Sequence, residues 1–201
     1  MRFRPTIIVL AAGRGSRFGG LQHKLEQAFE ASTVLGTTLR HAVETQLPVV
    51  VVTTAALAPL ASGLLARRDI VVLDADEAAR GMGASIAAGV AERSGAPGWL
   101  VLPGDMPLVR SGSVLAVASA LELHAVTYAQ YRGRRGHPVG FAAELYSELM
   151  QLQGDDGARR VVSRYPAHGV DVDDRGVVLD VDTQPDLEAM RAASGVTQTL
   201  K

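Results

Sequence analysis

The chain has 201 residues, 47% of them hydrophobic, so it can bury a substantial core and fits one domain of ordinary size better than two. Its 20 lysines and arginines nearly balance 21 aspartates and glutamates, which excludes a strong overall field toward nucleic acid or an anionic membrane. The chain has no cysteine, which excludes disulfides, thiolate metal sites and a cysteine nucleophile, and favours a reducing cytoplasm as its compartment.

Short β-branched runs alternate with helical patterns along the first 123 residues. The runs are apolar throughout and predict buried strands at 7–10, 49–52, 70–73 and 99–102. Apolar residues at helical spacing predict helices around 39–43, 86–90 and 114–121. Strands of this kind belong in a mostly parallel sheet that helices cover on both faces.

The uncharged stretch 46–66 approaches the length of a membrane span. Two prolines, a glycine and three hydroxyl residues interrupt it. We therefore expect a buried strand over 49–53, followed by a helix that places Leu57, Leu60 and Leu64 on one face.

After Leu123 the pattern changes. Residues 125–131 and 137–141 predict two strands joined by a charged, glycine-rich turn, so the sheet gains an antiparallel component. Further along, we expect a helix that ends at Gly154, a shorter helix after Asp156, and a turn-linked pair of strands at 170–172 and 177–179.

The last helix has clear start signals. Thr183 can cap it, Pro185 lies in its first turn, and Asp186 completes a capping box. We expect one three-layer α/β/α domain over residues 1–193 and a frayed tail over 194–201.

The segment from Leu10 to Gly19, Leu-Ala-Ala-Gly-Arg-Gly-Ser-Arg-Phe-Gly, follows the first predicted strand. Small residues and glycines let backbone amides converge on phosphate oxygens, and Arg14, Arg17 and Lys24 add positive charge. The segment matches neither the P-loop nor the Rossmann fingerprint. A nucleoside-triphosphate loop is the favoured interpretation, and a glycine-rich turn with solvated arginines is the alternative.

A second motif, Leu102-Pro-Gly-Asp-Met-Pro107, ends the fourth predicted strand. Open α/β sheets bind ligands at such strand ends, and a carboxylate beside a triphosphate is well suited to Mg²⁺. Asp105 is therefore a candidate metal ligand. The alternative is an aspartate that only forms the turn.

The loop, the lysine that follows it and the central Gly-Asp-Met-Pro motif resemble the MobA-like nucleotidyltransferase superfamily. Four later motifs occur in the order found in the molybdenum cofactor cytidylyltransferase branch, at 80–85, 136–141, 154–159 and 180–183. The similarity covers nearly the whole chain, and it implies a single-domain Rossmann-like fold.

The resemblance also implies roles for individual residues. Lys24, Arg17 and Asp105 would be catalytic, and Asp105 with Asp182 would hold the metal. Nucleotide-binding positions would be Leu10, Ala11, Ala12, Gly13, Arg14, Gly15, Ser16, Arg17, Lys24, Gly81, Met82, Gly83, Ser85 and Asp105. His137 and Pro138 would lie near the acceptor.

Simpler interpretations stay open for several of these residues. Asp182 can serve only to start the last helix, the residues from Met82 to Ser85 only to begin a helix, and His137 only as a structural histidine whose hydrogen bonds are satisfied. The sequence also departs from the family pattern: Glu26 and Glu30 follow the loop, and Asp74 and Asp76 lie where relatives often have an asparagine.

The activity implied by the resemblance is Mg²⁺-dependent transfer of CMP from CTP to the phosphate of molybdopterin, with release of pyrophosphate. Ala12 points to CTP, because the guanylyl-transferring branch has glycine there. A molybdoenzyme or its chaperone would be the partner, with neither nucleic acid nor membrane involved. Alternatives are a guanylyltransferase, a cytidylyltransferase with another phosphorylated acceptor, and a non-catalytic cofactor-binding module. Candidates for stacking on the acceptor ring are Tyr128, Tyr131 and Phe141.

Overall fold

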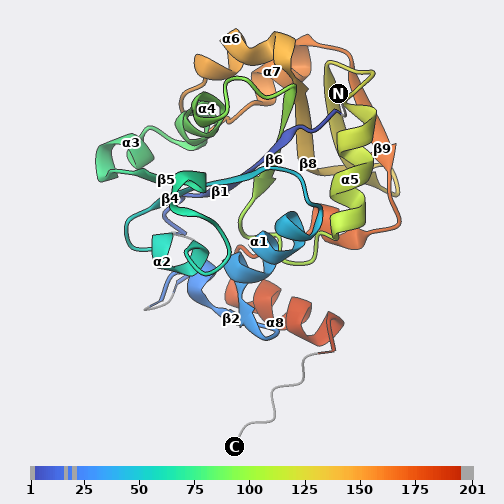
Figure 1. Ribbon diagram of the computed structural model, residues 1–201. Coiled ribbons are helices and arrows are strands. Elements are labelled where there is room, and N and C mark those ends of the chain that lie inside the picture. The colour runs from blue at the N-terminus through green and yellow to red at the C-terminus, as the bar shows by residue number, and fades with distance from the viewer. Residues whose placement is uncertain (1–2, 16–17, 20–21, 196–201) are drawn as a thin grey trace, which may run out of the picture.

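Figure 1 shows the computed structural model of the chain, which describes residues 3–15, 18–19 and 22–195. Within these residues, a seven-stranded sheet with the order β5-β4-β1-β6-β8-β7-β9 runs through the middle, and helices lie on both of its faces. The expected three-layer α/β domain with a mostly parallel sheet is confirmed.

One half of the sheet is parallel. Its strands are β1 (Thr6–Ala11), β4 (Val49–Thr54), β5 (Ile70–Leu73) and β6 (Gly98–Pro103). They correspond to the four predicted apolar runs. Successive side chains of β1 enter opposite cores, with Ile7 and Val9 on one side and Ile8 on the other, and all three are fully buried. Burial on both faces explains why the runs are continuous rather than alternating.

The other half contains the expected antiparallel strands. Strand β8 (Arg134–Ala142) pairs antiparallel with both β6 and β7 (Val126–Tyr131), and β9 (Ala167–Asp171) pairs parallel with β7. The hairpin turn is tighter than the sequence suggested, because Arg132 and Gly133 alone form it. Both have positive φ, at 48° and 77°, as a two-residue type I′ turn requires.

Two sets of helices cover the sheet. One core is closed by α1 (Val34–Glu44), α2 (Ala58–Ala61), α5 (Ser111–Ala120) and α8 (Gln184–Ala193). The opposite core is closed by α3 (Ala75–Ala79), α4 (Met82–Glu92), α6 (Tyr146–Met150) and α7 (Arg159–Arg164). The small elements are β2 (Ala28–Phe29), β3 (Ser32–Thr33), η1 (Lys24–Glu26), η2 (Arg67–Asp69), η3 (Ala143–Leu145) and η4 (Arg175–Val178). None of the helices in the described ranges is long and apolar enough to cross a membrane.

Two predictions of secondary structure are wrong. The second strand of the expected final pair is absent, because Val177 and Val178 lie in η4 and the chain there wraps around the buried carboxylate of Asp174. The helix expected after β4 is only the four residues of α2, which ends before Gly63. The capping box of α8 is as expected, and its hydrogen bonds from Thr183 lower the pKa of Asp186.

Asp174 holds the segment before α8 against the N-terminus of α5. Its carboxylate is 3% exposed and accepts hydrogen bonds from the Arg110 amide (2.9 Å), the Ser113 hydroxyl (2.7 Å) and the Gly176 amide (2.9 Å). No residue of this set is a candidate for catalysis.

We expect Asp174→Ala to lower the free energy of unfolding by about 3–5 kcal/mol, because it leaves two buried donors and one partly buried donor without an acceptor. Urea denaturation measures this. The matched control is Asp173→Ala, which removes an exposed carboxylate from the neighbouring position and should stay within about 0.5 kcal/mol of the wild type. Equal unfolding free energies for the two variants would show that the Asp174 hydrogen bonds do not stabilise the fold.

Candidate active site

The site lies where the carboxyl ends of β1 and β6 meet. The chain passes from β1 to β4 and β5 on one side and then returns to β6 on the other, so a topological switch point separates β1 from β6. Such a point leaves a crevice above the strand ends. The Gly104 amide donates to the Leu10 carbonyl (2.8 Å), which joins the two segments that follow these strands.

The loop after β1 starts buried and becomes exposed. Ala11 and Ala12 point into opposite cores, whereas Gly13 and Arg14 are exposed. Gly15 has a φ of +59°, and a side chain there would press on the ring of His23, whose Nε2 lies 2.9 Å from the Gly13 carbonyl oxygen. Ser16 and Arg17 lie outside the described residues, so their expected roles on the triphosphate stay predictions.

Lys24 connects this loop to two carboxylates far away in the sequence. Its Nζ lies 2.6 Å from Asp105 Oδ2 and 3.2 Å from Asp182 Oδ1, and the side chain is only 14% exposed. Burial acts to lower the pKa of Lys24, but the charge of Asp105 and hydrogen bonds to Asp105 and Asp182 together raise it above its ordinary value. The ammonium is therefore charged at neutral pH.

Asp180 joins these carboxylates. Ligand oxygens of Asp105, Asp180 and Asp182 all lie within 4.8 Å of one another. Desolvation raises the pKa of Asp180, and the charges of Asp105 and Asp182 raise it further. The sequence motif contained Asp180, but we did not predict it as a ligand. The available signal was the Asp-x-Asp spacing, which puts both carboxylates on one side of an extended segment.

The cluster is anchored from beneath by Val181. Its side chain is fully buried in the same core as α8, and its amide donates to the Asp105 carbonyl (2.9 Å). One apolar residue thus holds the flanking carboxylates of Asp180 and Asp182 against the end of β6.

The carboxylates fit a divalent cation. Asp105 Oδ1 is buried and has no hydrogen-bond partner among the described residues. Burying an unpaired carboxylate oxygen costs free energy, and a divalent cation that prefers oxygen ligands would offset this cost. The two residues predicted to hold metal, Asp105 and Asp182, are together, and Asp180 supplies a third oxygen donor.

Comparison with known proteins identifies the family of the chain. The sequence model of one protein family, described as the MobA-like NTP transferase domain, matches residues 7–170 of this chain. The chain belongs to the MobA-like NTP transferase family. It is 30% identical to the purine catabolism protein PucB of Bacillus subtilis over 92% of this chain and 95% of that protein.

Solved structures share the fold of the chain. Rv0371c of Mycobacterium tuberculosis has a TM-score of 0.79 and 28% identity, covering 93% of this chain and 97% of that one. Its complex with manganese has a TM-score of 0.75 and 25% identity, covering 98% of this chain and all of that one. Membership of the MobA-like family makes the protein a nucleotidyltransferase.

The glycine-rich start of α4 is closely packed in this MobA-like domain. A side chain at Gly81 or Gly83 would collide with the backbone of Gln153 and Gly154, and the Gly83 amide donates to the Gly154 carbonyl (2.8 Å). The Gly83 amide therefore already has an acceptor within the protein. Met82 is 48% exposed, and Ser85 is buried in the first turns of the helix.

His137 lies beside the acid cluster, and Pro138 next to it is buried. Burial lowers the pKa of His137 to about 4, and the charge of Asp105 only partly opposes this. The imidazole is therefore neutral at physiological pH.

This gives an expected pH dependence of stability. The unfolded state, with the ordinary pKa of 6.5, takes up a proton at higher pH than the folded state, so stability falls as the pH drops from about 6.5 toward 4. Between pH 7 and pH 4.5 we expect His137 to account for about 2 kcal/mol of lost unfolding free energy. Denaturant titrations of the wild type and His137→Asn should differ in slope across this range. Parallel curves would refute the assignment.

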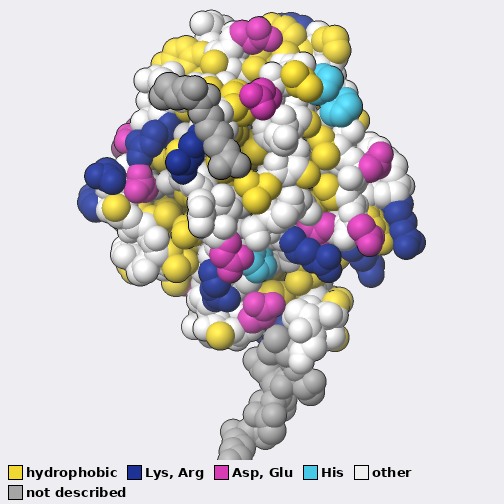
Figure 2. Space-filling model, turned by 45° about the vertical axis from the view of Figure 1, so that its right-hand side comes forward, with side chains coloured by type: hydrophobic (Ala, Val, Ile, Leu, Met, Phe, Trp, Pro, Cys, Tyr) yellow, Lys and Arg dark blue, Asp and Glu magenta, His cyan; other side chains and the backbone are white. Residues whose placement is uncertain are grey.

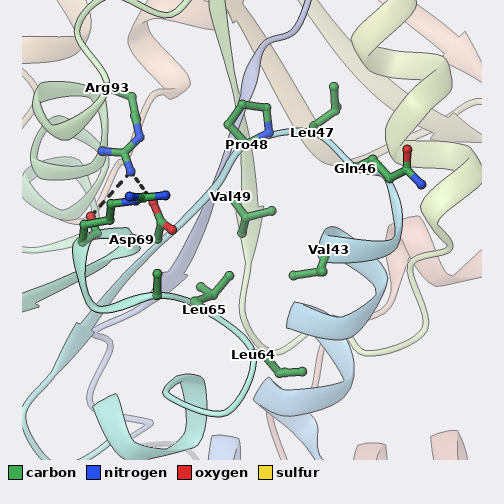
Figure 3. A pocket seen from close by; sticks show the side chains of 11 residues that line it. Val43, Gln46, Leu47, Pro48, Val49, Leu64, Leu65, Asp69 and Arg93 are labelled. Atoms are coloured by element: carbon green, nitrogen blue, oxygen red, sulfur yellow. Dashed lines mark hydrogen bonds and ion pairs between the residues drawn. The ribbon is translucent and has the colours of Figure 1, made fainter.

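A cleft in the described part of the chain lies elsewhere (Figure 3). It has a volume of ≈ 550 Å³ and opens at the amino end of β4, where Leu47, Pro48 and Leu65 line it and Arg93 pairs with Asp69. Because β4 and β6 are parallel within one sheet, this is the edge opposite Asp105. None of the predicted site residues lines it.

The surface charge is mixed. On the face shown in Figure 2, basic and acidic side chains are interspersed over much of the molecule. This agrees with the near-zero net charge of −1. Binding of a highly charged substrate therefore depends on the local groups around the crevice.

Proposed function

We propose that the protein transfers CMP from CTP to the phosphate of a molybdopterin-type acceptor, with a divalent cation, and releases pyrophosphate. The observation that carries this proposal is the pairing of Lys24 with Asp105 and Asp182 at the carboxyl ends of β1 and β6. It joins the cation that follows the glycine-rich loop to the carboxylates that fit a metal.

The proposed reaction is an in-line displacement. An oxygen of the acceptor phosphate forms a bond to the α-phosphorus of CTP, and the bond from that phosphorus to the bridging oxygen breaks. The electron pair leaves with pyrophosphate. The acceptor phosphate is already ionised, so no general base is required, and positioning with charge stabilisation supplies the rate enhancement.

The chain's own residues would hold the substrates as follows. Amides of the loop from Ala11 to Gly15, with Arg14 and Arg17, bind the triphosphate. Lys24 rests on Asp105 and Asp182 before substrate binds and can turn on its flexible stem to the leaving phosphates. Asp105, Asp180 and Asp182 would hold Mg²⁺, which when bound neutralises charge on the phosphate oxygens.

CTP is proposed as the nucleotide because of Ala12. Its side chain is 4% exposed and packs in the core that contains Ile86 of α4, whose N-terminal residues Met82 and Ser85 are proposed to line the nucleotide. A methyl group here narrows the space beneath the base relative to glycine, a small difference of the kind that shifts base preference. GTP is the alternative that the same geometry permits.

The molybdopterin acceptor rests on the resemblance of later motifs to the cytidylyltransferase branch. That branch makes the cofactor form used by xanthine-dehydrogenase-type enzymes, which oxidise a purine, and the 30% identical relative is named a purine catabolism protein. The delivery partner would then be a molybdoenzyme or its chaperone. Intact Lys24 and Asp105 argue against a purely cofactor-carrying module.

The test is pyrophosphate release by the purified protein with Mg²⁺, molybdenum cofactor, and CTP, GTP, ATP or UTP in turn. We expect release with CTP that depends on both cofactor and metal. Preference for GTP would overturn the base assignment. No release with any triphosphate would overturn the enzymatic proposal.

A further inference from the structure

The antiparallel half of the sheet carries a group of arginines that the proposed reaction has not used. Arg132, Arg134 and Arg135 lie at the β7–β8 hairpin and are exposed. Among the described residues, none of the three has a carboxylate within ion-pair distance. They are therefore available to an anionic ligand.

Arg132 lies over the Tyr131 ring, with its guanidinium carbon 5.2 Å from the ring centroid. Arg135 is held more closely. Its guanidinium carbon lies 4.1 Å from the centroid of the Tyr128 ring, within cation–π range. The Tyr128 ring in turn lies against Gly169 of β9, where any side chain would press on the ring atoms. With one face of the guanidinium covered by the ring, its edge N–H groups remain free for a bidentate anion.

Strand β8 has an irregularity next to Arg135. Tyr128 pairs with Val139 and Gln130 with Arg135, so two steps along β7 match four steps along β8. The extra length lies within residues 136–138, and a side chain at Gly136 would collide with the Val177 carbonyl of η4. This packing fixes the bulged segment against the chain that leads into Asp180.

The bulged segment contains His137, on which the charge of Asp105 acts. Arg135 comes two residues before His137 in the same strand. Both lie at the sheet edge that carries Asp105, since the start of β8 is antiparallel to the end of β6.

A basic group on the β8 side would favour binding of the acceptor. Lys24 pairs with Asp105 and Asp182, and the triphosphate loop lies on the β1 side. A phosphate dianion that approaches from the β8 side is attracted by a basic group there.

Among the aromatic residues considered for the acceptor side, only Tyr128 is suitably placed. Phe141 is fully buried, and Tyr131 packs against the core on the other face of the sheet. Tyr128 is partly exposed and carries Arg135.

We propose that Arg135, held on the ring of Tyr128, binds the phosphate of the acceptor and selects acceptors that are phosphate monoesters. This inference rests on the proposed function and deepens it. Arg135 contacts the acceptor, and Tyr128 is a positioning residue that acts through Arg135.

Steady-state kinetics with saturating CTP and varied molybdopterin-type cofactor test the proposal. Arg135→Gln should raise the KM for the acceptor roughly 10- to 100-fold, because it removes a charged, bidentate hydrogen bond. The KM for CTP should not change, and kcat should stay within about threefold, since ground-state and transition-state binding are lost together. The acceptor KM of Arg135→Lys should lie between those of the wild type and Arg135→Gln, because lysine keeps the charge but lacks the planar guanidinium.

The hairpin offers a matched control. Arg134→Gln removes the same charge one residue away, where no ring holds the side chain, and should change the acceptor KM less than about twofold. Tyr128→Phe keeps the ring and should behave as the wild type, whereas Tyr128→Leu should raise the acceptor KM by several fold, roughly the loss of one cation–π contact.

Equilibrium binding of molybdopterin without nucleotide, followed by pterin fluorescence, separates this inference from the proposed function. Weaker binding by Arg135→Gln but not by Arg134→Gln supports the site, even if the wild type fails to transfer CMP. If the wild type transfers CMP and Arg135→Gln has the same acceptor affinity and acceptor KM as the wild type, the proposed role of Arg135 is overturned. The proposed function then stands. A wild type that does not bind molybdopterin overturns both.

Discussion

Asp105→Asn is expected to lower kcat/KM for nucleotidyl transfer by at least roughly 10³-fold, because it replaces a charged metal ligand at the point where charge develops. Asparagine has the same shape, and the Asp105 carbonyl still accepts the Val181 amide. The fold should therefore survive. Pyrophosphate release measures the loss, and thermal denaturation checks the fold.

A metal titration makes this result specific. Binding of Mn²⁺, followed by electron paramagnetic resonance, should weaken by at least about tenfold in Asp105→Asn. The control is Asp173→Asn, which removes an exposed acidic charge outside the cluster and should change neither activity nor metal binding. Near-normal activity in Asp105→Asn would refute the metal role of this carboxylate.

Lys24→Met is expected to lower kcat/KM by roughly 10²–10³-fold, the size of effect that follows loss of one preorganised charge on a leaving group. Methionine keeps most of the apolar stem of lysine. Lys24→Arg retains the charge with a different shape and should lose less activity.

The two variants should have opposite effects on metal affinity. Lys24 sits between Asp105 and Asp182 and neutralises part of their charge, so its removal leaves the carboxylates without this cation. Mn²⁺ should bind Lys24→Met more tightly than the wild type in the absence of nucleotide, whereas it binds Asp105→Asn more weakly. Weaker binding in both variants would show that Lys24 does not compete with the metal.

The parallel half of the fold could be predicted because its strands are buried on both faces. Such positions are occupied mainly by β-branched and aliphatic residues, as at Ile7, Ile8 and Val9. The start of α8 was equally clear, since a capping box depends on residues close together in the chain.

The wrong prediction of a strand at 177–179 depended on distant residues. Val177 and Val178 have strand propensity, but the Asp174 carboxylate, which also binds Arg110 and Ser113 of another element, holds the chain in η4. Tertiary hydrogen bonds override local propensity there.

The candidate site shows the same division. The loop and Asp105 follow strand ends, which sequence reasoning can place at one sheet edge. The direct pairing of Lys24 with Asp182, 158 positions later in the chain, leaves no local pattern. Nor does the bulge in β8, which is visible only in the register of the paired strands.

The fate of isotopically labelled CTP tests the central claim most directly. With Mg²⁺ and molybdenum cofactor, label from [α-³²P]CTP should appear in the cofactor, and label from [γ-³²P]CTP in pyrophosphate. Both should require the intact cofactor phosphate. Recovery of the α-label only as free CMP, or of the γ-label as inorganic phosphate, would contradict nucleotidyl transfer to the acceptor.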